Sequence, residues 1–97
     1  MDITVQELKQ RLDAGEKLNL FDVREPNEYE ADNIGAKLIP LGDVPYELDQ
    51  FDGLQDEELI VHCRSGSRSA QAQRILEENG FTNVRNLIGG MVAYREL

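Results

Sequence analysis

The chain contains a single cysteine, Cys63, which stands where a short apolar run meets a small loop rich in serine and arginine. Residues 61–69 read VHCRSGSRS. A thiol is a nucleophile only when ionised, and an ordinary cysteine with a pKa of about 8.5 is mostly protonated at neutral pH. Arginine side chains and the free N–H groups at the start of a helix both lower a thiol pKa. The pattern therefore predicts a reactive thiolate in a cradle that also attracts anions.

A lone cysteine at the end of a strand is, by itself, more often a small buried hydrophobic residue. The residues that follow Cys63 favour the reactive interpretation, because two arginines, a glycine and the start of a helical pattern come together there. The serines can donate hydrogen bonds to an anion, although they are also ordinary turn and cap residues. The predicted cradle consists of Arg64, Ser65, Gly66, Ser67, Arg68 and Ser69.

The elements predicted around this loop alternate between helix and strand. Helices are predicted over residues 5–14, 26–31, 45–51, 67–79 and 91–96, and short strands over 18–23, 37–39, 59–62 and 83–87. This order is typical of an α/β domain, and we expect one domain over residues 1–97 with a mostly parallel sheet of about five short strands and helices on both faces. Binding sites in such sheets lie beyond the carboxyl ends of the strands, where Asp22, Arg24 and Cys63 fall.

The composition narrows the possible partners. The chain has 97 residues, 40% of them hydrophobic and 30% charged, which suits one ordinary globular domain. Its formal net charge of −9 disfavours nucleic acid and anionic membranes as partners. A protein that recognises the whole surface would be basic or neutral. An anionic substrate would need a local positive site.

One cysteine and one histidine exclude an internal disulfide and leave no credible metal constellation, so neither a metal nor a cofactor is predicted. Residues 1–10 show no signal-peptide pattern, and no window approaches the roughly 18 apolar residues of a membrane span. We therefore expect no membrane partner and a cytoplasmic location, where a free thiol stays reduced.

Three stretches together resemble one family. CRSGSRS at residues 63–69, DVREPNEY at residues 22–29 and NLIGGM at residues 86–91 occur in the order found in the rhodanese homology domain, in its single-domain thiosulfate sulfurtransferase type. The resemblance covers residues 20–94 and implies a rhodanese-like fold. One segment departs from the family pattern: residues 32–36 lack its proline and are one residue shorter. We expect this change to affect donor specificity at the pocket rim.

The resemblance implies an enzyme that moves sulfane sulfur by double displacement. Cys63 would attack the outer sulfur of thiosulfate or a similar donor, release sulfite, and pass its persulfide to cyanide, a thiol or a protein acceptor. The loop backbone would form the cradle, and Arg64 and Arg68 would attract the anion. The alternative is a persulfide carrier, a sulfur relay that docks on a biosynthetic enzyme. Retention of Cys63 and both arginines counts against a third possibility, a regulatory module with an idle thiol.

The length of the loop bears on a different chemistry. Tyrosine-type phosphatases resemble this loop but separate cysteine and arginine by one residue more than the four between Cys63 and Arg68. The smaller cradle resembles the sulfur-handling type and disfavours phosphatase or arsenate reductase activity.

Several neighbours of the loop are predicted to support it. We expect Asp22 to accept hydrogen bonds from loop groups; the alternative is a surface ion pair between Arg24 and Glu28, worth about 0–1 kcal/mol. His62 should point to the opposite face of its strand and serve structure rather than catalysis. Glycines 89–90 are expected to permit the turn into the last helix.

Overall fold

A parallel sheet of four short strands forms the centre of the computed structural model, which describes residues 1–97. The elements are α1 (Val5–Asp13), β1 (Leu20–Asp22), α2 (Pro26–Ala31), β2 (Lys37–Leu38), the 3₁₀ helices η1 (Leu41–Tyr46) and η2 (Leu48–Phe51), β3 (Leu59–His62), α3 (Ser67–Glu78), β4 (Val84–Asn86) and α4 (Gly90–Arg95). None of the helices has the length and apolar character needed to cross a bilayer.

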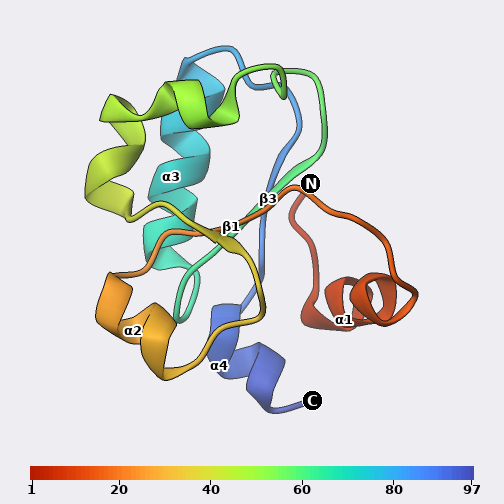
Figure 1. The fold of residues 1–97 in the computed structure, drawn as a ribbon. Coiled ribbons are helices and arrows are strands. Elements are labelled where there is room, and N and C mark those ends of the chain that lie inside the picture. Colours follow the sequence, from red (N-terminus) through yellow and green to blue (C-terminus); the bar gives the residue numbers. More distant parts are fainter.

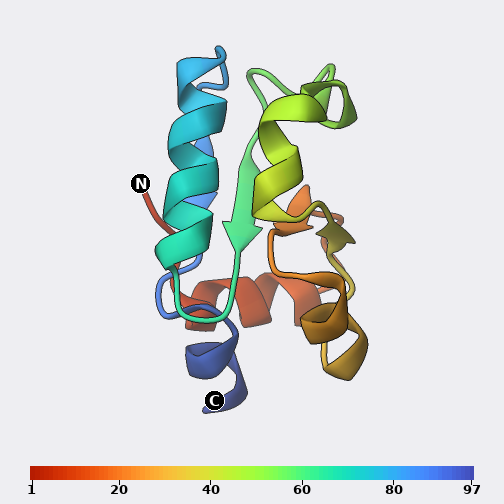
Figure 2. The same ribbon diagram turned by 90° about the vertical axis from the view of Figure 1, so that its left-hand side faces the viewer.

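The strands are ordered β2-β1-β3-β4, and every neighbouring pair is parallel. A single parallel bridge between Ile3 and Leu87 extends the pairing. The predicted α/β class is confirmed, with four strands and this bridge in place of about five strands. Because all strands run the same way, their carboxyl ends meet at one edge, where α2, α4 and the beginning of α3 also lie (Figure 2).

Helices cover both faces of the sheet, as predicted. In Figure 1, α3 and the two 3₁₀ helices lie on one side of the strands and α1 lies on the other. Alternate strand residues point to opposite faces. The core on the α3 side contains Phe21, Val23, Ile39, Val44, Phe51, Leu59, Val61, Cys63, Ala72, Leu76, Phe81 and Val84. The core on the α1 side contains Ile3, Val5, Leu8, Leu20, Ala36, Ile60 and Leu87, with Ala93 and Tyr94 of α4 packed against it.

The helix predicted over residues 45–51 is wrong in type and start. The chain instead forms two short 3₁₀ helices that begin at Leu41, and Pro45 lies inside the first. The segment is anchored by Phe51, whose ring centroid lies 4.5 Å from that of Phe21 and 6.0 Å from that of Phe81. Burial of this aromatic residue, rather than regular helical hydrogen bonding, determines how the segment packs.

Candidate active site

The thiol of Cys63 lies directly after β3 and receives hydrogen bonds from the loop that follows. Its Sγ accepts bonds from the N–H of Gly66 at 3.1 Å, from the N–H of Ser69 at 3.4 Å and from Ser69 Oγ at 3.3 Å. The residue is only 1% exposed. The structure thus brings two loop amides and one hydroxyl, from Gly66 and Ser69, onto the sulfur.

Two opposing effects act on the ionisation of this thiol. Burial by itself raises the pKa of Cys63, because a buried thiolate is poorly solvated. The hydrogen bonds from Ser69 Oγ and from the loop amides stabilise the thiolate and outweigh burial. The pKa of Cys63 therefore lies below its ordinary value, and the ionised, nucleophilic form is favoured.

The loop owes its shape to Gly66 and to a residue of the neighbouring strand. Gly66 has a φ of +111°, a left-handed conformation that suits glycine, and α3 begins at the next residue. Asn86 at the end of β4 donates its Nδ2 to Gly66 O at 3.1 Å and accepts the Ser69 hydroxyl at 2.6 Å. The sequence analysis did not identify Asn86 as a site residue. Its position at the start of the NLIGGM stretch, within the strand predicted over residues 83–87, was the available signal.

The beginning of α4 holds the other side of the loop. The N–H groups of Met91 and Val92 donate to the carbonyl oxygens of Cys63 and Arg64, each at 3.0 Å. These are N–H groups from the first turn of a helix, which have no partner inside it. A Cβ added to Gly90 would lie 2.6 Å from both carbonyl oxygens, so the close approach requires glycine there.

The two loop arginines have different surroundings. Arg68 donates to both carboxylate oxygens of Glu28, at 2.6 and 2.9 Å, and so joins α3 to α2. This contact raises the pKa of Arg68 and lowers the pKa of Glu28 to about 2. Arg64 is exposed and makes no ion pair. Arg64 is therefore the loop cation whose charge is not already matched by a carboxylate.

The structure corrects both the predicted hydrogen bonds from the loop to Asp22 and the alternative ion pair between Arg24 and Glu28. Its carboxylate accepts bonds from the backbone N–H of Arg24 at 3.0 Å and from the Arg24 guanidinium at 2.7–3.0 Å, and it accepts none from the loop. Arg24 in turn donates to Asp32 O at 2.6 Å rather than to Glu28. Residues 22 and 24 share a side of the extended chain, so the guanidinium can fold back onto the carboxylate. The pair is buried, unlike the predicted surface ion pair.

His62 is buried against the opposite face of the sheet from Cys63. Neither ring nitrogen has a hydrogen-bond partner, and Nε2 lies 3.9 Å from Asp22 Oδ2, beyond hydrogen-bond distance. Burial lowers the pKa of His62, which is therefore neutral at physiological pH. No contact joins this ring to the thiol.

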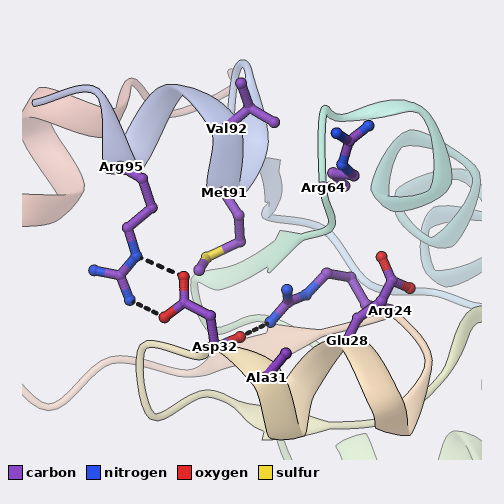
Figure 3. Close-up of a pocket in the computed structure, with 8 residues that line it drawn as sticks. All are labelled: Arg24, Glu28, Ala31, Asp32, Arg64, Met91, Val92 and Arg95. Atoms are coloured by element: carbon purple, nitrogen blue, oxygen red, sulfur yellow. Dashed lines mark hydrogen bonds and ion pairs between the residues drawn. The ribbon is translucent and has the colours of Figure 1, made fainter.

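A pocket of about 330 Å³ opens beside the loop, between α2 and α4 (Figure 3). It is lined by Arg24, Glu28, Ala31, Asp32, Arg64, Met91, Val92 and Arg95. Arg95 closes one end by donating to both carboxylate oxygens of Asp32, at 2.8 and 2.6 Å. Cys63 is not part of the lining, but the pocket meets the loop at the next residue, Arg64.

A family model, the rhodanese-like domain, matches residues 4–97. The match spans nearly the whole sequence and includes the loop, its supporting strand and both helices of the pocket. The chain therefore belongs to the rhodanese-like domain family.

Individual relatives agree with this assignment. Over 91 residues the chain is 38% identical to YrkF of Bacillus subtilis, which is provisionally named a sulfur carrier protein. The match covers 93% of this chain but only 48% of YrkF. It is 38% identical over 94 residues to YtwF of the same organism, provisionally named a sulfurtransferase, with 96% of this chain and 88% of YtwF covered. The solved structure of the human single-domain sulfurtransferase TSTD1 is similar with a TM-score of 0.83, 28% identity, and 98% and 95% coverage.

Proposed function

We propose that this chain transfers sulfane sulfur through a persulfide on Cys63. Membership of the rhodanese-like family and the names of YrkF and YtwF support sulfur transfer in general. The observation that carries the proposal is the convergence of the Gly66 and Ser69 donors on Sγ, because it favours the thiolate that must attack the donor.

In the first half-reaction, the Cys63 thiolate attacks the outer sulfur of the donor, with thiosulfate as the reference compound. A new S–S bond forms, the sulfur–sulfur bond of thiosulfate breaks, and sulfite leaves with the electron pair. The amides of Gly66 and Ser69, which donate to Sγ, would stabilise the resulting persulfide anion. Arg64 would attract the donor and stabilise the departing anion. Arg68, held by Glu28, would mainly fix the loop against α2.

In the second half-reaction, an acceptor attacks the outer sulfur of the persulfide and releases the Cys63 thiolate. Cyanide or a small thiol would give an ordinary sulfurtransferase. A protein acceptor would give a persulfide carrier. The name of YrkF, which is about twice as long as the matched segment, favours keeping the carrier as a second candidate. The net charge of −9 suits an acceptor with a basic docking surface.

Both candidates need a reduced thiol. We therefore propose the cytoplasm as the location, because thiols are kept reduced there.

The test is the intact mass of the protein after incubation with thiosulfate. A gain of one sulfur atom, removed by cyanide and absent in Cys63→Ser, is expected. A protein that gains no sulfur although its thiol still reacts with iodoacetamide would refute the proposal. Comparing steady-state thiosulfate:cyanide turnover with single-turnover loading then separates the candidates, since fast loading with negligible turnover identifies a carrier.

A further inference from the structure

The first residues of the chain run along the outer edge of β4. Ile3 donates its N–H to Asn86 O at 3.0 Å, and its carbonyl oxygen accepts the N–H of Ile88 at 2.9 Å. The segment therefore pairs with β4 on the side away from β3 (Figure 2). In extended backbone the N–H and C=O of one residue point to the same side, so the N–H of Asn86 also faces this segment.

Asp2 provides the acceptor for this N–H. Its Oδ1 accepts the backbone N–H of Asn86 at 3.1 Å and the side-chain amide of Gln73 at 2.8 Å. The same Gln73 amide donates to Val84 O at 2.8 Å. One carboxylate oxygen therefore joins the edge strand β4 to the helix α3.

The two elements that Asp2 joins are the elements that direct donors at the thiol. Gln73 follows Ser69 by four positions on α3, so the two side chains lie on the same face of that helix. The Asn86 side chain accepts the Ser69 hydroxyl at 2.6 Å and donates to Gly66 O at 3.1 Å. Gly66 and Ser69 in turn donate to the sulfur. A continuous series of hydrogen bonds thus connects the carboxylate to the thiol.

We propose that Asp2 is a positioning residue of the thiol site. Its carboxylate fixes the main chain at Asn86, so that the Asn86 side chain keeps the Gly66 and Ser69 donors directed at the sulfur. Asp2 makes no hydrogen bond to the sulfur and does not line the pocket, so it acts through Asn86. The inference rests on the proposed function and deepens it, because the thiolate that Asp2 supports is the one that would attack the donor.

The experiment measures the pH profile of Cys63 alkylation by iodoacetamide in Asp2→Ala and Asp2→Asn. Asp2→Ala removes the acceptor, so the loop donors are held less firmly, the pKa of the thiol rises, and alkylation at pH 7 slows by about threefold. The rate at high pH, where the whole thiol is ionised, should stay within about twofold of the parent rate.

Asp2→Asn separates the accepted hydrogen bonds from the charge. The amide oxygen of asparagine can still accept both bonds, so this variant should recover most of the parent profile. An Asp2→Asn profile equal to that of Asp2→Ala, or a parent-like profile in Asp2→Ala, would overturn the inference.

Thr4→Ala is the matched control for stability. The Thr4 side chain accepts the Glu7 N–H at 3.1 Å and caps α1, and it makes no bond to β4. Loss of this cap should lower the midpoint of urea unfolding without changing the alkylation profile. If Thr4→Ala shifts the profile as far as Asp2→Ala does, general loosening of the fold controls the thiol, and the inference fails.

A double-mutant cycle tests the route through Asn86. Asn86→Ala removes the side chain that contacts Gly66 and Ser69. In that background, Asp2→Ala should change the alkylation rate at pH 7 by less than about 1.5-fold, because the group through which Asp2 acts is gone. An equal effect of Asp2→Ala in both backgrounds would contradict the proposed route.

The two proposals fail in different ways. If thiosulfate adds no sulfur to a Cys63 thiol that iodoacetamide alkylates, the proposed function fails, and the alkylation profiles still decide the role of Asp2. If the parent chain gains sulfur but Asp2→Ala is alkylated like the parent, sulfur transfer stands and only the role of Asp2 is wrong.

Discussion

Cys63 and His62 are adjacent in the chain, yet their polar atoms lie in opposite environments. On the α3 face, the sulfur of Cys63 accepts three hydrogen bonds from the loop. On the other face, both nitrogens of His62 are buried without a partner. The strand turns successive side chains to opposite sides of the sheet, and only one side has the amide donors of a loop that leads into a helix.

The difference shows that position relative to the loop, rather than the presence of a titratable group, determines where the chemistry lies. Burial disfavours the charged form of both residues. At Cys63 the hydrogen bonds overcome this effect and lower the pKa of the thiol. At His62 nothing opposes it strongly enough, and the ring stays neutral.

The largest expected effect comes from disturbing the support of the Cys63 side. Gly90→Ala would place a Cβ 2.6 Å from the carbonyl oxygens of Cys63 and Arg64, at a residue with a φ of +58°. We expect the free energy of unfolding to fall by about 2–3 kcal/mol, because both overpacking and left-handed strain oppose the substitution. Urea unfolding measures this loss, and iodoacetamide alkylation shows whether the loop has moved.

Gly80→Ala is the matched control. Gly80 also has a positive φ, of +92°, but an added Cβ would meet no atom within 4 Å. Only the backbone strain remains, so the expected loss is about 1 kcal/mol. Equal losses in the two variants would show that the contact between α4 and the loop does not constrain the site.

An intermediate effect is expected from the hydroxyl of Ser69. Its single proton is shared among Cys63 Sγ at 3.3 Å, Gly66 O at 3.2 Å and Asn86 Oδ1 at 2.6 Å, so it contributes less than a dedicated donor. Ser69→Ala should raise the pKa of Cys63 and slow alkylation at pH 7 by about fivefold, the equivalent of about 1 kcal/mol, which is less than the roughly 1.5–3 kcal/mol of a dedicated hydrogen bond to a charged group. The pH dependence of iodoacetamide alkylation measures both.

Ser67→Ala removes a hydroxyl from the same loop and makes a close comparison. The Ser67 side chain is exposed and makes no hydrogen bond to Sγ. The alkylation profile of this variant should match that of the parent chain. Identical shifts in both variants would mean that loop disturbance, rather than a lost donor, moves the pKa of Cys63.

Local sequence patterns were sufficient to predict the helices whose start and face are marked by residues within the helix itself. The second helix was predicted over residues 26–31 and is observed over Pro26–Ala31; the helix predicted over 67–79 is observed over Ser67–Glu78. Proline at a first helical position and apolar residues at helical spacing are short-range signals. The same short-range geometry correctly placed His62 on the face opposite Cys63.

The pairings that complete the site depend on residues distant in the chain, and sequence patterns did not reveal them. Glu28 and Arg68 are 40 residues apart, and Ser69 and Asn86 are 17 apart. Both contacts exist only after the sheet has brought the carboxyl ends of its strands together. The loop arginines look equivalent in sequence for this reason, although Arg68 is bound to a carboxylate and Arg64 is not.

The smallest expected effect tests the His62 side of the comparison. The pKa of His62 is lowered in the folded protein, so below its ordinary value of about 6.5 the unfolded chain binds a proton that the folded chain does not. The contribution of the neutral His62 ring to stability is complete above that pH and declines as the pH falls. His62→Leu should therefore leave the free energy of unfolding at pH 7.5 unchanged or raise it by up to about 1 kcal/mol, because no hydrogen bond is lost. It should also reduce the decline of that free energy between pH 7.5 and 5.5.

Urea unfolding of both proteins at pH 7.5 and 5.5 measures this difference. The carboxylates of Glu28 and Glu58, whose pKa values are lowered to about 2, lose their contributions only at lower pH, so they do not obscure the window. The alkylation profile of Cys63 should stay the same in His62→Leu, since the ring lies across the sheet from the thiol. An altered profile would show that the two faces are coupled, and a full pH-dependent decline in the variant would show that His62 is not its source.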